Sequence, residues 1–229
     1  MTKAGIDQEA LIAMFEQATA RQGETLRKAV GDATLKALQG RELTMENIRK
    51  VLQSVTQAST QGLAKSSLDP DTVESLLAKT FAGMDAALLQ AVQANQRALQ
   101  QFVAQGADLQ DKQMQQAMAG IEKMEDVFFS AVGKAAKSVE GPLQQSWAHV
   151  LDAMKMQGTH TGAQADKAVE DLMEQARSSL REGRKNSLRA VQAMMDSYAA
   201  LVSGVLIGMS EGLSQGTAAA PAARTTRRR

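Results

Sequence analysis

The sequence contains no cysteine, three prolines and few aromatic side chains. Without cysteine the chain can form neither a disulfide nor a thiolate metal site, and it has no cysteine nucleophile. The chain has two histidines, which are few ligands for a histidine-based metal site. Aromatic residues make up 3% of the 229 residues, fewer than a β-sandwich or an α/β sheet ordinarily uses. These scarcities argue against most enzyme classes and against a sheet-based fold.

Alanine and glutamine take the place of the missing residue types, with 39 and 24 copies. Long stretches rich in Ala, Gln, Leu and Met, and free of proline, favour helix throughout. Hydrophobic residues reach 44%, which is enough to bury a core. We therefore expect one all-α domain over residues 1–214, followed by a disordered basic tail over residues 215–229.

The net charge of +1 hides an asymmetry. Because the four arginines of the tail contribute +4, the rest of the chain carries −3. The tail arginines are Arg224, Arg227, Arg228 and Arg229. The first 30 residues show no secretory signal, since acidic residues interrupt them, and the cytoplasm is the simplest expected compartment.

Caps and breakers predict about five long amphipathic helices. Their expected ranges are 7–39, 45–66, 70–105, 109–157 with a kink at Pro142, and 162–213. Their expected N-caps are Thr44, Asp69, Asp108 and Thr161. Short connections place successive helices antiparallel, so we expect an elongated antiparallel bundle. In it, the 70–105 helix and the next helix up to residue 139 should form one hairpin.

Two apolar stripes repeat with the period of a helix. The first comprises Met114, Met118, Ile121, Met124, Phe128, Val132, Ala135, Val139, Leu143, Trp147, Val150 and Met154. The second comprises Val169, Leu172, Ala176, Leu180, Val191, Met194, Tyr198, Leu201, Val205 and Met209. Core packing is the commoner role of such methionine-rich stripes, and an exposed apolar face that adsorbs to lipid, polymer or helices is the alternative.

Catalytic signatures are absent from the sequence. It contains no nucleophile elbow, no Walker loop, no zinc-protease motif and no dinucleotide-binding glycine motif. His149 and His160 have no visible partner for acid–base chemistry, so we interpret them as ordinary helical residues. We expect no enzyme activity, no cofactor, no metal and no small-molecule substrate.

Small residues at a spacing of four form a ladder near the C-terminus: Ala200, Gly204, Gly208 and Gly212. On a helix all four share one face and let another backbone approach closely. The ladder lies in an uncharged stretch of 14 residues, which spans about 21 Å and falls short of a membrane. We expect close helix packing here, within or between chains, with contact to an apolar surface as the alternative.

A basic strip precedes the ladder and comprises Arg177, Arg181, Arg184, Lys185 and Arg189. A solvated helix face is the common explanation for such a strip. The alternative is that the strip and the tail arginines together bind an anionic partner such as DNA or lipid headgroups, weakly and in a salt-dependent way.

The chain resembles the phasins, helical proteins that coat bacterial polyhydroxyalkanoate granules. The resemblance lies in helices such as FAGMDAALLQAVQANQRALQQFVAQ and in the tail AAAPAARTTRRR, a short version of the basic tails of granule proteins that contact DNA. The chain is also similar to a bacterial family of unknown function, in stretches such as TLKALQGRELTMENIRKVLQSV. The phasin resemblance implies a non-enzymatic coat or organiser protein without a cofactor.

Two hypotheses follow from these patterns. The first is a cytoplasmic protein that coats a polyhydroxyalkanoate granule or lipid surface with its amphipathic helices. The second is a soluble helical oligomer that acts as a scaffold or binds nucleic acid weakly. An apolar face left exposed in the monomer favours the first, and a closed bundle with buried stripes favours the second. Self-association is expected in either case.

Overall fold

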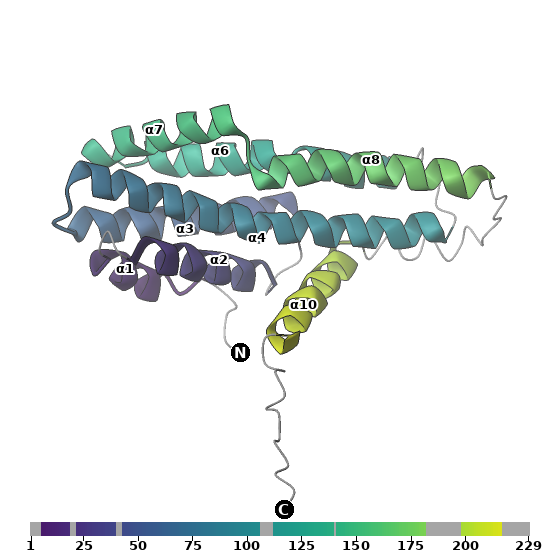
Figure 1. Cartoon of the computed structure of the whole chain (residues 1–229), viewed down its shortest axis with the longest axis horizontal. Helices are drawn as coiled ribbons and strands as arrows, with labels where there is room; N and C mark the ends of the chain where they lie inside the picture. The colour runs from purple at the N-terminus through teal and green to yellow at the C-terminus, as the bar shows by residue number, and fades with distance from the viewer. Residues whose placement is uncertain are drawn as a thin grey trace, which may run out of the picture.

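The computed structural model describes residues 6–18, 22–39, 43–105, 112–139, 141–181 and 198–216. Within these ranges all regular structure is helical and no strand occurs, which confirms the predicted all-α class. The helices form an elongated bundle (Figure 1). They are α1 (Gln8–Glu16), α2 (Gly23–Gln39), α3 (Met45–Lys65), α4 (Pro70–Ala104), α5 (Lys112–Glu122), α6 (Met124–Lys137), α7 (Pro142–Gln157), α8 (His160–Arg181) and α10 (Tyr198–Gly216).

The bundle has layers that follow the chain order (Figure 1). The long helix α4 lies in the middle with α3. On one side of them lie α1 and α2, and on the other side lie α6, α7 and α8. Helix α10 leaves this body obliquely and contacts α4 and α2.

The prediction of about five long helices was wrong in number, because three of them are divided. The 7–39 helix splits into α1 and α2. The 109–157 helix splits into α5, α6 and α7, with a turn at Lys123 and a second break before Pro142. Gly141 has a φ of 86° and Pro142 occupies the first turn of α7. Pro142 therefore starts a new helix and does not kink an existing one, because its ring fits only a first turn.

The predicted 162–213 helix corresponds to α8 and α10. Residues 182–197 lie between them and outside the described residues, so the predicted continuity of this helix is not tested. The expected cap Asp108 and most of the expected tail, residues 217–229, also lie outside the described residues. Helix α10 extends to Gly216, slightly beyond its predicted end and into the range expected for the tail.

The two best-predicted helices have local caps. The side chain of Thr44 accepts a hydrogen bond from the backbone N–H of Asn47 at 3.2 Å. Asp69 accepts from the backbone N–H of Thr72 at 2.9 Å, which with the Thr72 hydroxyl lowers the pKa of Asp69. Pro70 follows Asp69 in the first turn of α4. These signals act within four residues, and the predicted ranges 45–66 and 70–105 are confirmed to within one residue.

Most of the first apolar stripe belongs to the hydrophobic core. Its members from Met114 to Ala135 are all buried, and so are Trp147 and Val150. The ring of Phe128 stacks on Phe81 of α4 with centroids 4.3 Å apart. The second stripe is shifted by one position in α10. There the buried residues are Val202 and Leu206, while the predicted stripe residues are half-buried.

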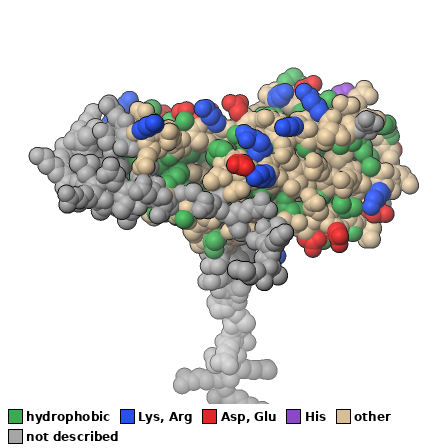
Figure 2. Space-filling model, turned by 180° about the vertical axis from the view of Figure 1, so that it is seen from behind, with side chains coloured by type: hydrophobic (Ala, Val, Ile, Leu, Met, Phe, Trp, Pro, Cys, Tyr) green, Lys and Arg blue, Asp and Glu red, His purple; other side chains and the backbone are tan. Residues whose placement is uncertain are grey.

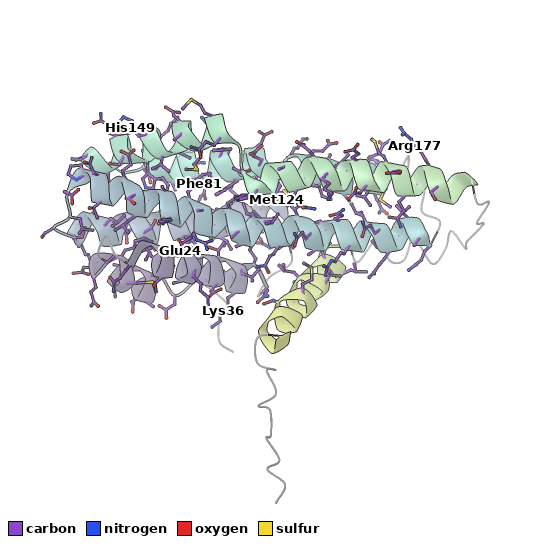
Figure 3. The ribbon with its side chains drawn as sticks, viewed as in Figure 1. Glu24, Lys36, Phe81, Met124, His149 and Arg177 are labelled. Carbon is purple, nitrogen blue, oxygen red and sulfur yellow. The ribbon has the colours of Figure 1, made fainter. Side chains whose placement is uncertain are left out.

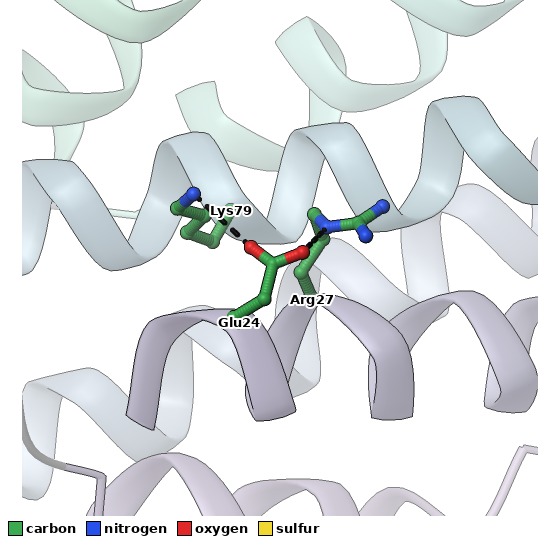
Figure 4. A network of polar contacts seen from close by, with 3 residues as sticks. All are labelled: Glu24, Arg27 and Lys79. Carbon is green, nitrogen blue, oxygen red and sulfur yellow. Dashed lines mark hydrogen bonds and ion pairs between the residues drawn. The ribbon is translucent and has the colours of Figure 1, made fainter. Parts of the chain in front are cut away.

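Helix α2 packs closely on α4 through glycine. A Cβ on Gly83 would clash with the carbonyl oxygen of Arg27, and a Cβ on Gly31 would lie 3.3 Å from the carbonyl oxygen of Gly83. At the surface, Glu24 of α2 accepts from Arg27 at 2.5 Å and from Lys79 of α4 at 3.2 Å (Figure 4). These two bonds lower the pKa of Glu24. Gly31 therefore serves the close packing of α2 on α4.

Helices α7 and α8 run alongside α4 in the same direction and in constant register. Polar pairs with a sequence separation of 75 link them: His149 to Glu74, the backbone N–H of His160 to Asp85, Gln96 to Asp171, and Gln175 to the carbonyl oxygen of Gln100. The sequence separation is the same in all four pairs because α7 and α8 both run parallel to α4. The turn at Gly158 and Thr159 joins the two helices without changing this register.

The hairpin expected between residues 70–105 and 109–139 is confirmed only in part. The contact between Phe81 and Phe128 shows that α6 returns beside α4. However, α6 packs chiefly on α3, and the main neighbours of α4 are α2 and α8. The two phenylalanine rings of α6, Phe128 and Phe129, provide its contact with Phe81 of α4.

Candidate functional site

The expected basic strip begins on α8, next to acidic side chains. Arg177 is exposed, and it lines a groove of about 710 Å³ together with carboxylates of α5 and α8. The acidic lining residues are Glu122, Asp166, Glu170 and Glu174. All four are exposed, and none forms an ion pair with another described residue. The described part of α8 therefore offers a predominantly acidic surface, not a basic one.

Most of the basic strip cannot be placed. Arg181 ends α8, and its side chain lies outside the described part of the chain. Arg184, Lys185, Arg189 and the tail arginines 224, 227, 228 and 229 also lie outside the described residues. On the face shown in Figure 2, the described Lys and Arg side chains are interspersed with Asp and Glu. The strip and the tail thus remain a prediction from the sequence.

The described ladder residues of α10, Ala200, Gly204 and Gly208, point away from the bundle. Ala200, Gly204 and Gly208 are exposed, and a Cβ built on either glycine would have no heavy atom within 4 Å. Gly212 belongs to the same helix, but its surroundings are not described. The ladder therefore makes no close helix packing with the described part of its own chain. Packing between chains stays a prediction.

The opposite face of α10 holds the helix on the body. Val202 and Leu206 are completely buried. The Tyr198 hydroxyl donates to the side-chain oxygen of Asn95 on α4 at 2.7 Å, and its ring lies 6.2 Å from Phe102. Burial raises the pKa of the Tyr198 hydroxyl well above its ordinary value. Because one face is anchored in this way, the ladder face is held outward in a fixed orientation.

The N-terminus of α8 is a buried polar junction that the sequence did not reveal. The carboxylate of Asp85, on α4 and 4% exposed, accepts hydrogen bonds from the backbone N–H groups of His160 and Thr161, both at 3.0 Å. Glu125 of α6 accepts from the backbone N–H and the hydroxyl of Thr159. Two carboxylates thus compensate the positive end of the α8 dipole. Each is far from α8 in sequence, so no local pattern indicates the junction.

The expected cap at Thr161 was wrong by two residues. Thr159 caps α8, since its hydroxyl accepts from the backbone N–H of Gly162 at 2.9 Å. The Thr161 hydroxyl instead donates to the carbonyl oxygen of Asp85, and the amide of Gln164 donates to Gln96. Thr161 and Gln164 have the three-residue spacing of a capping box, but they do not cap α8. Both side chains bind residues of α4 instead.

The two histidines lie apart and serve structural contacts. His149 is exposed on α7 (Figure 3). Its Nδ1 lies 3.4 Å from a carboxylate oxygen of Glu74. His160 is also exposed and uses its backbone N–H, as described above. Among the described residues, no three histidine or acidic side chains are grouped so as to hold a metal ion. Within the same residues, no helix has the length and apolar character to cross a membrane.

Comparison with known proteins places the chain in a family. A model of a family of unknown function, DUF6781, matches residues 1–215. The chain belongs to this family. The match covers all the described helices of the bundle except the last residue of α10.

The DUF6781 match confirms the resemblance to a family of unknown function. The phasin resemblance finds no support in the comparisons. No curated protein and no solved structure matches the chain.

Proposed function

We propose that this DUF6781 protein is a non-enzymatic helical scaffold that self-associates through the outward face of α10. Most of the first apolar stripe is buried within the bundle, which favours a scaffold over a coat made of opened helices. The described large hydrophobic side chains that remain exposed are scattered: Met14, Met156, Met173 and Ile207. Only Ile207 lies beside the glycine ladder.

The observation that carries the proposal is the composition of the outward face of α10. Ala200, Gly204 and Gly208 are exposed together with Ile207, and residues 197–210 contain no charge. Each glycine in a helix costs about 1 kcal/mol relative to alanine, and no contact within the described chain offsets this cost. A second α10 could approach the flat backbone closely and cover Ile207.

Two variants of this face test self-association. The first variant replaces both Gly204 and Gly208 with Leu. The new side chains would not clash within the described monomer, but they would occupy the surface that a second helix approaches. Lys in place of Ile207 adds a charge to the same surface. We expect both variants to have a lower mass in sedimentation equilibrium than the wild type while keeping its helical content. Gly120→Leu, on α5, is the matched control and should keep the wild-type mass.

The proposal is contradicted if the wild type is monomeric at all concentrations measured, or if both α10 variants keep its mass. A lower melting temperature of the double leucine variant without any change of mass would indicate that the ladder packs inside its own chain. Circular dichroism of each variant verifies that the bundle is retained.

A second proposal is that the same face of α10 lies on an apolar surface, such as a polyhydroxyalkanoate granule or a lipid layer. Its support is the uncharged, exposed character of the face around Ile207. A fluorescent fusion that concentrates on granules, and disperses with Ile207→Lys, would favour this proposal. A cytoplasmic fusion that is diffuse in both forms would favour the scaffold.

Weak contact with DNA or another anionic surface is proposed for the basic strip and the tail. Its support is the sequence alone: five cations over residues 177–189 and four in the tail. Titration of labelled duplex DNA at two salt concentrations tests it. Deleting residues 217–229 should reduce the slope of log K against log salt by at most about four. Absence of binding at about 50 mM salt would exclude this contact.

A further inference from the structure

A groove of about 600 Å³ lies between α6 and α7, which pack side by side at one end of the bundle (Figure 1). Its lining includes the half-buried side chains of Phe129 and Leu151 and the methyl group of Ala148. Phe129 continues into the core, since its ring lies 5.5 Å from Phe81. The groove thus has an apolar floor that is joined to the hydrophobic core.

Gly133 keeps part of this groove open. A Cβ built on Gly133 would meet a single neighbouring atom within 4 Å, the Cδ1 of Leu151 at 3.8 Å. This is an ordinary contact distance, so a side chain at position 133 would enter the groove without displacing the backbone. The open volume is therefore due to the absence of a side chain and can be filled by substitution.

The rim of the groove is cationic. Lys134 and Lys137 of α6 and Lys155 of α7 line it and are exposed, and Asp152 is the acidic lining residue. None of these lysines forms an ion pair with a described residue. The rim therefore carries a local excess of positive charge above an apolar floor, which complements a ligand with a negative head and an apolar body.

We propose that the groove between α6 and α7 binds a single-chain anionic amphiphile of the fatty-acid class. Its carboxylate lies among Lys134, Lys137 and Lys155, and its acyl chain covers Phe129 and Leu151. The volume falls within the range of small-molecule sites, about 300–1,000 Å³. The site uses no residue of α10, so it is independent of the function proposed above.

The shape of the floor favours an acyl chain over a peptide helix. A helix bound in a groove is held by apolar anchors at several successive turns, and each anchor needs its own pocket. Here Phe129 and Leu151 are the large apolar side chains of the lining. An acyl chain needs only continuous apolar surface and one cluster of positive charge, which the groove provides.

Trp147 gives a built-in measure of binding. It is the single tryptophan of the chain, it is completely buried on α7, and it directly precedes the lining residue Ala148. Titration of the full chain with dodecanoate should change the Trp147 emission in a saturable way. Calorimetry provides the affinity. We expect dodecanoate to bind at least about tenfold more tightly than dodecanol, and less tightly as salt rises.

Filling the groove tests its location. Gly133→Leu should abolish saturable dodecanoate binding, since the new side chain occupies the floor. Gly120→Leu is the matched control, because a Cβ on Gly120 also meets one side-chain atom at 3.8 Å, but on α5. It should bind dodecanoate as the wild type does. Equal binding by the two variants would overturn the proposed site.

Neutralising the rim tests the charge. Replacing Lys134, Lys137 and Lys155 with Gln should weaken dodecanoate about tenfold and leave dodecanol unchanged. The control replaces three exposed lysines elsewhere, Lys28, Lys36 and Lys167, and changes the net charge equally.

Three results would overturn the proposal. They are an equal loss of affinity in the two triple variants, no saturable binding by the wild type, and binding of an acidic helical peptide without binding of dodecanoate.

Discussion

Gly31 of α2 faces Gly83 of α4, so that a Cβ on Gly31 would lie 3.3 Å from the carbonyl oxygen of Gly83. A Cβ on Gly83 would be worse placed, since it would clash with the carbonyl oxygen of Arg27 and lie 3.0 Å from the Cβ of Val30. Neither obstacle is the end of a flexible side chain. The spacing of α2 and α4 therefore depends on two residues that lack side chains.

The close approach of α2 and α4 predicts that Gly83→Ala and Gly133→Ala change the free energy of unfolding in opposite directions. Helix propensity alone would predict the same stabilisation for both. Gly83→Ala should lower the free energy of unfolding by about 1–2 kcal/mol, because overpacking outweighs a gain of up to about 1 kcal/mol in propensity. Gly133→Ala, where the contact distance is ordinary, should raise it by about 0.5–1 kcal/mol. Urea unfolding of both variants measures the difference. An increase for Gly83→Ala would contradict the close packing of α2 on α4.

Asp85 should be the most costly polar residue of the bundle to remove. Asp85→Ala leaves the backbone N–H groups of His160 and Thr161 without their acceptor in a largely buried place. We expect a loss of about 2–4 kcal/mol in the free energy of unfolding. Asp69→Ala, which removes an exposed local cap, is the control and should cost clearly less than Asp85→Ala. Equal losses in the two variants would contradict the role of Asp85.

Tyr198 should make the protein sensitive to high pH. Its folded-state pKa is raised by burial above the ordinary value of 10.0. Since the folded state favours the neutral phenol, its contribution to stability is complete below pH 10.0 and is lost as the pH rises towards the folded pKa. Tyr198 is the single tyrosine, so absorbance of phenolate follows it alone. We expect ionisation to coincide with detachment of α10 or unfolding.

Tyr198→Phe is the matching variant for this pH dependence. It should lose about 1 kcal/mol at neutral pH, because the hydrogen bond to Asn95 is absent, and it should decline less steeply in stability above pH 10.0. Ionisation of Tyr198 at its ordinary pKa in the folded protein would show that α10 does not bury the ring.

Asp69 should make the protein sensitive to low pH, whereas Tyr198 makes it sensitive to high pH. Hydrogen bonds from Thr72 lower the folded-state pKa of Asp69 below 3.8, so its contribution is present above pH 3.8 and is lost as the pH falls through the folded value. Asp69→Asn keeps a good capping side chain but cannot titrate. We expect equal stability at neutral pH and a shallower acid decline than in the wild type. Melting temperatures across this pH range provide the measurement.

The accuracy of the sequence predictions follows the range of the interactions behind them. The caps at Thr44 and Asp69 were predicted correctly because each acts within its own first helical turn. The cap of α8 was misplaced because Thr161 satisfies the local pattern while its hydroxyl binds α4. The glycine ladder was found by its spacing, but spacing does not tell whether a face points inward or outward.

The sequence by itself determined the all-α class, the two long capped helices and the apolar stripe that fills the core, because helix propensity, capping and periodicity are properties of neighbouring residues. Only the tertiary structure decided that Gly31 and Gly83 meet, that Asp85 closes the start of α8, and that Gly204 and Gly208 face outward. The physical reason is that each of these depends on the distance between residues far apart in the chain. That distance is set by packing and leaves no periodic trace in either segment.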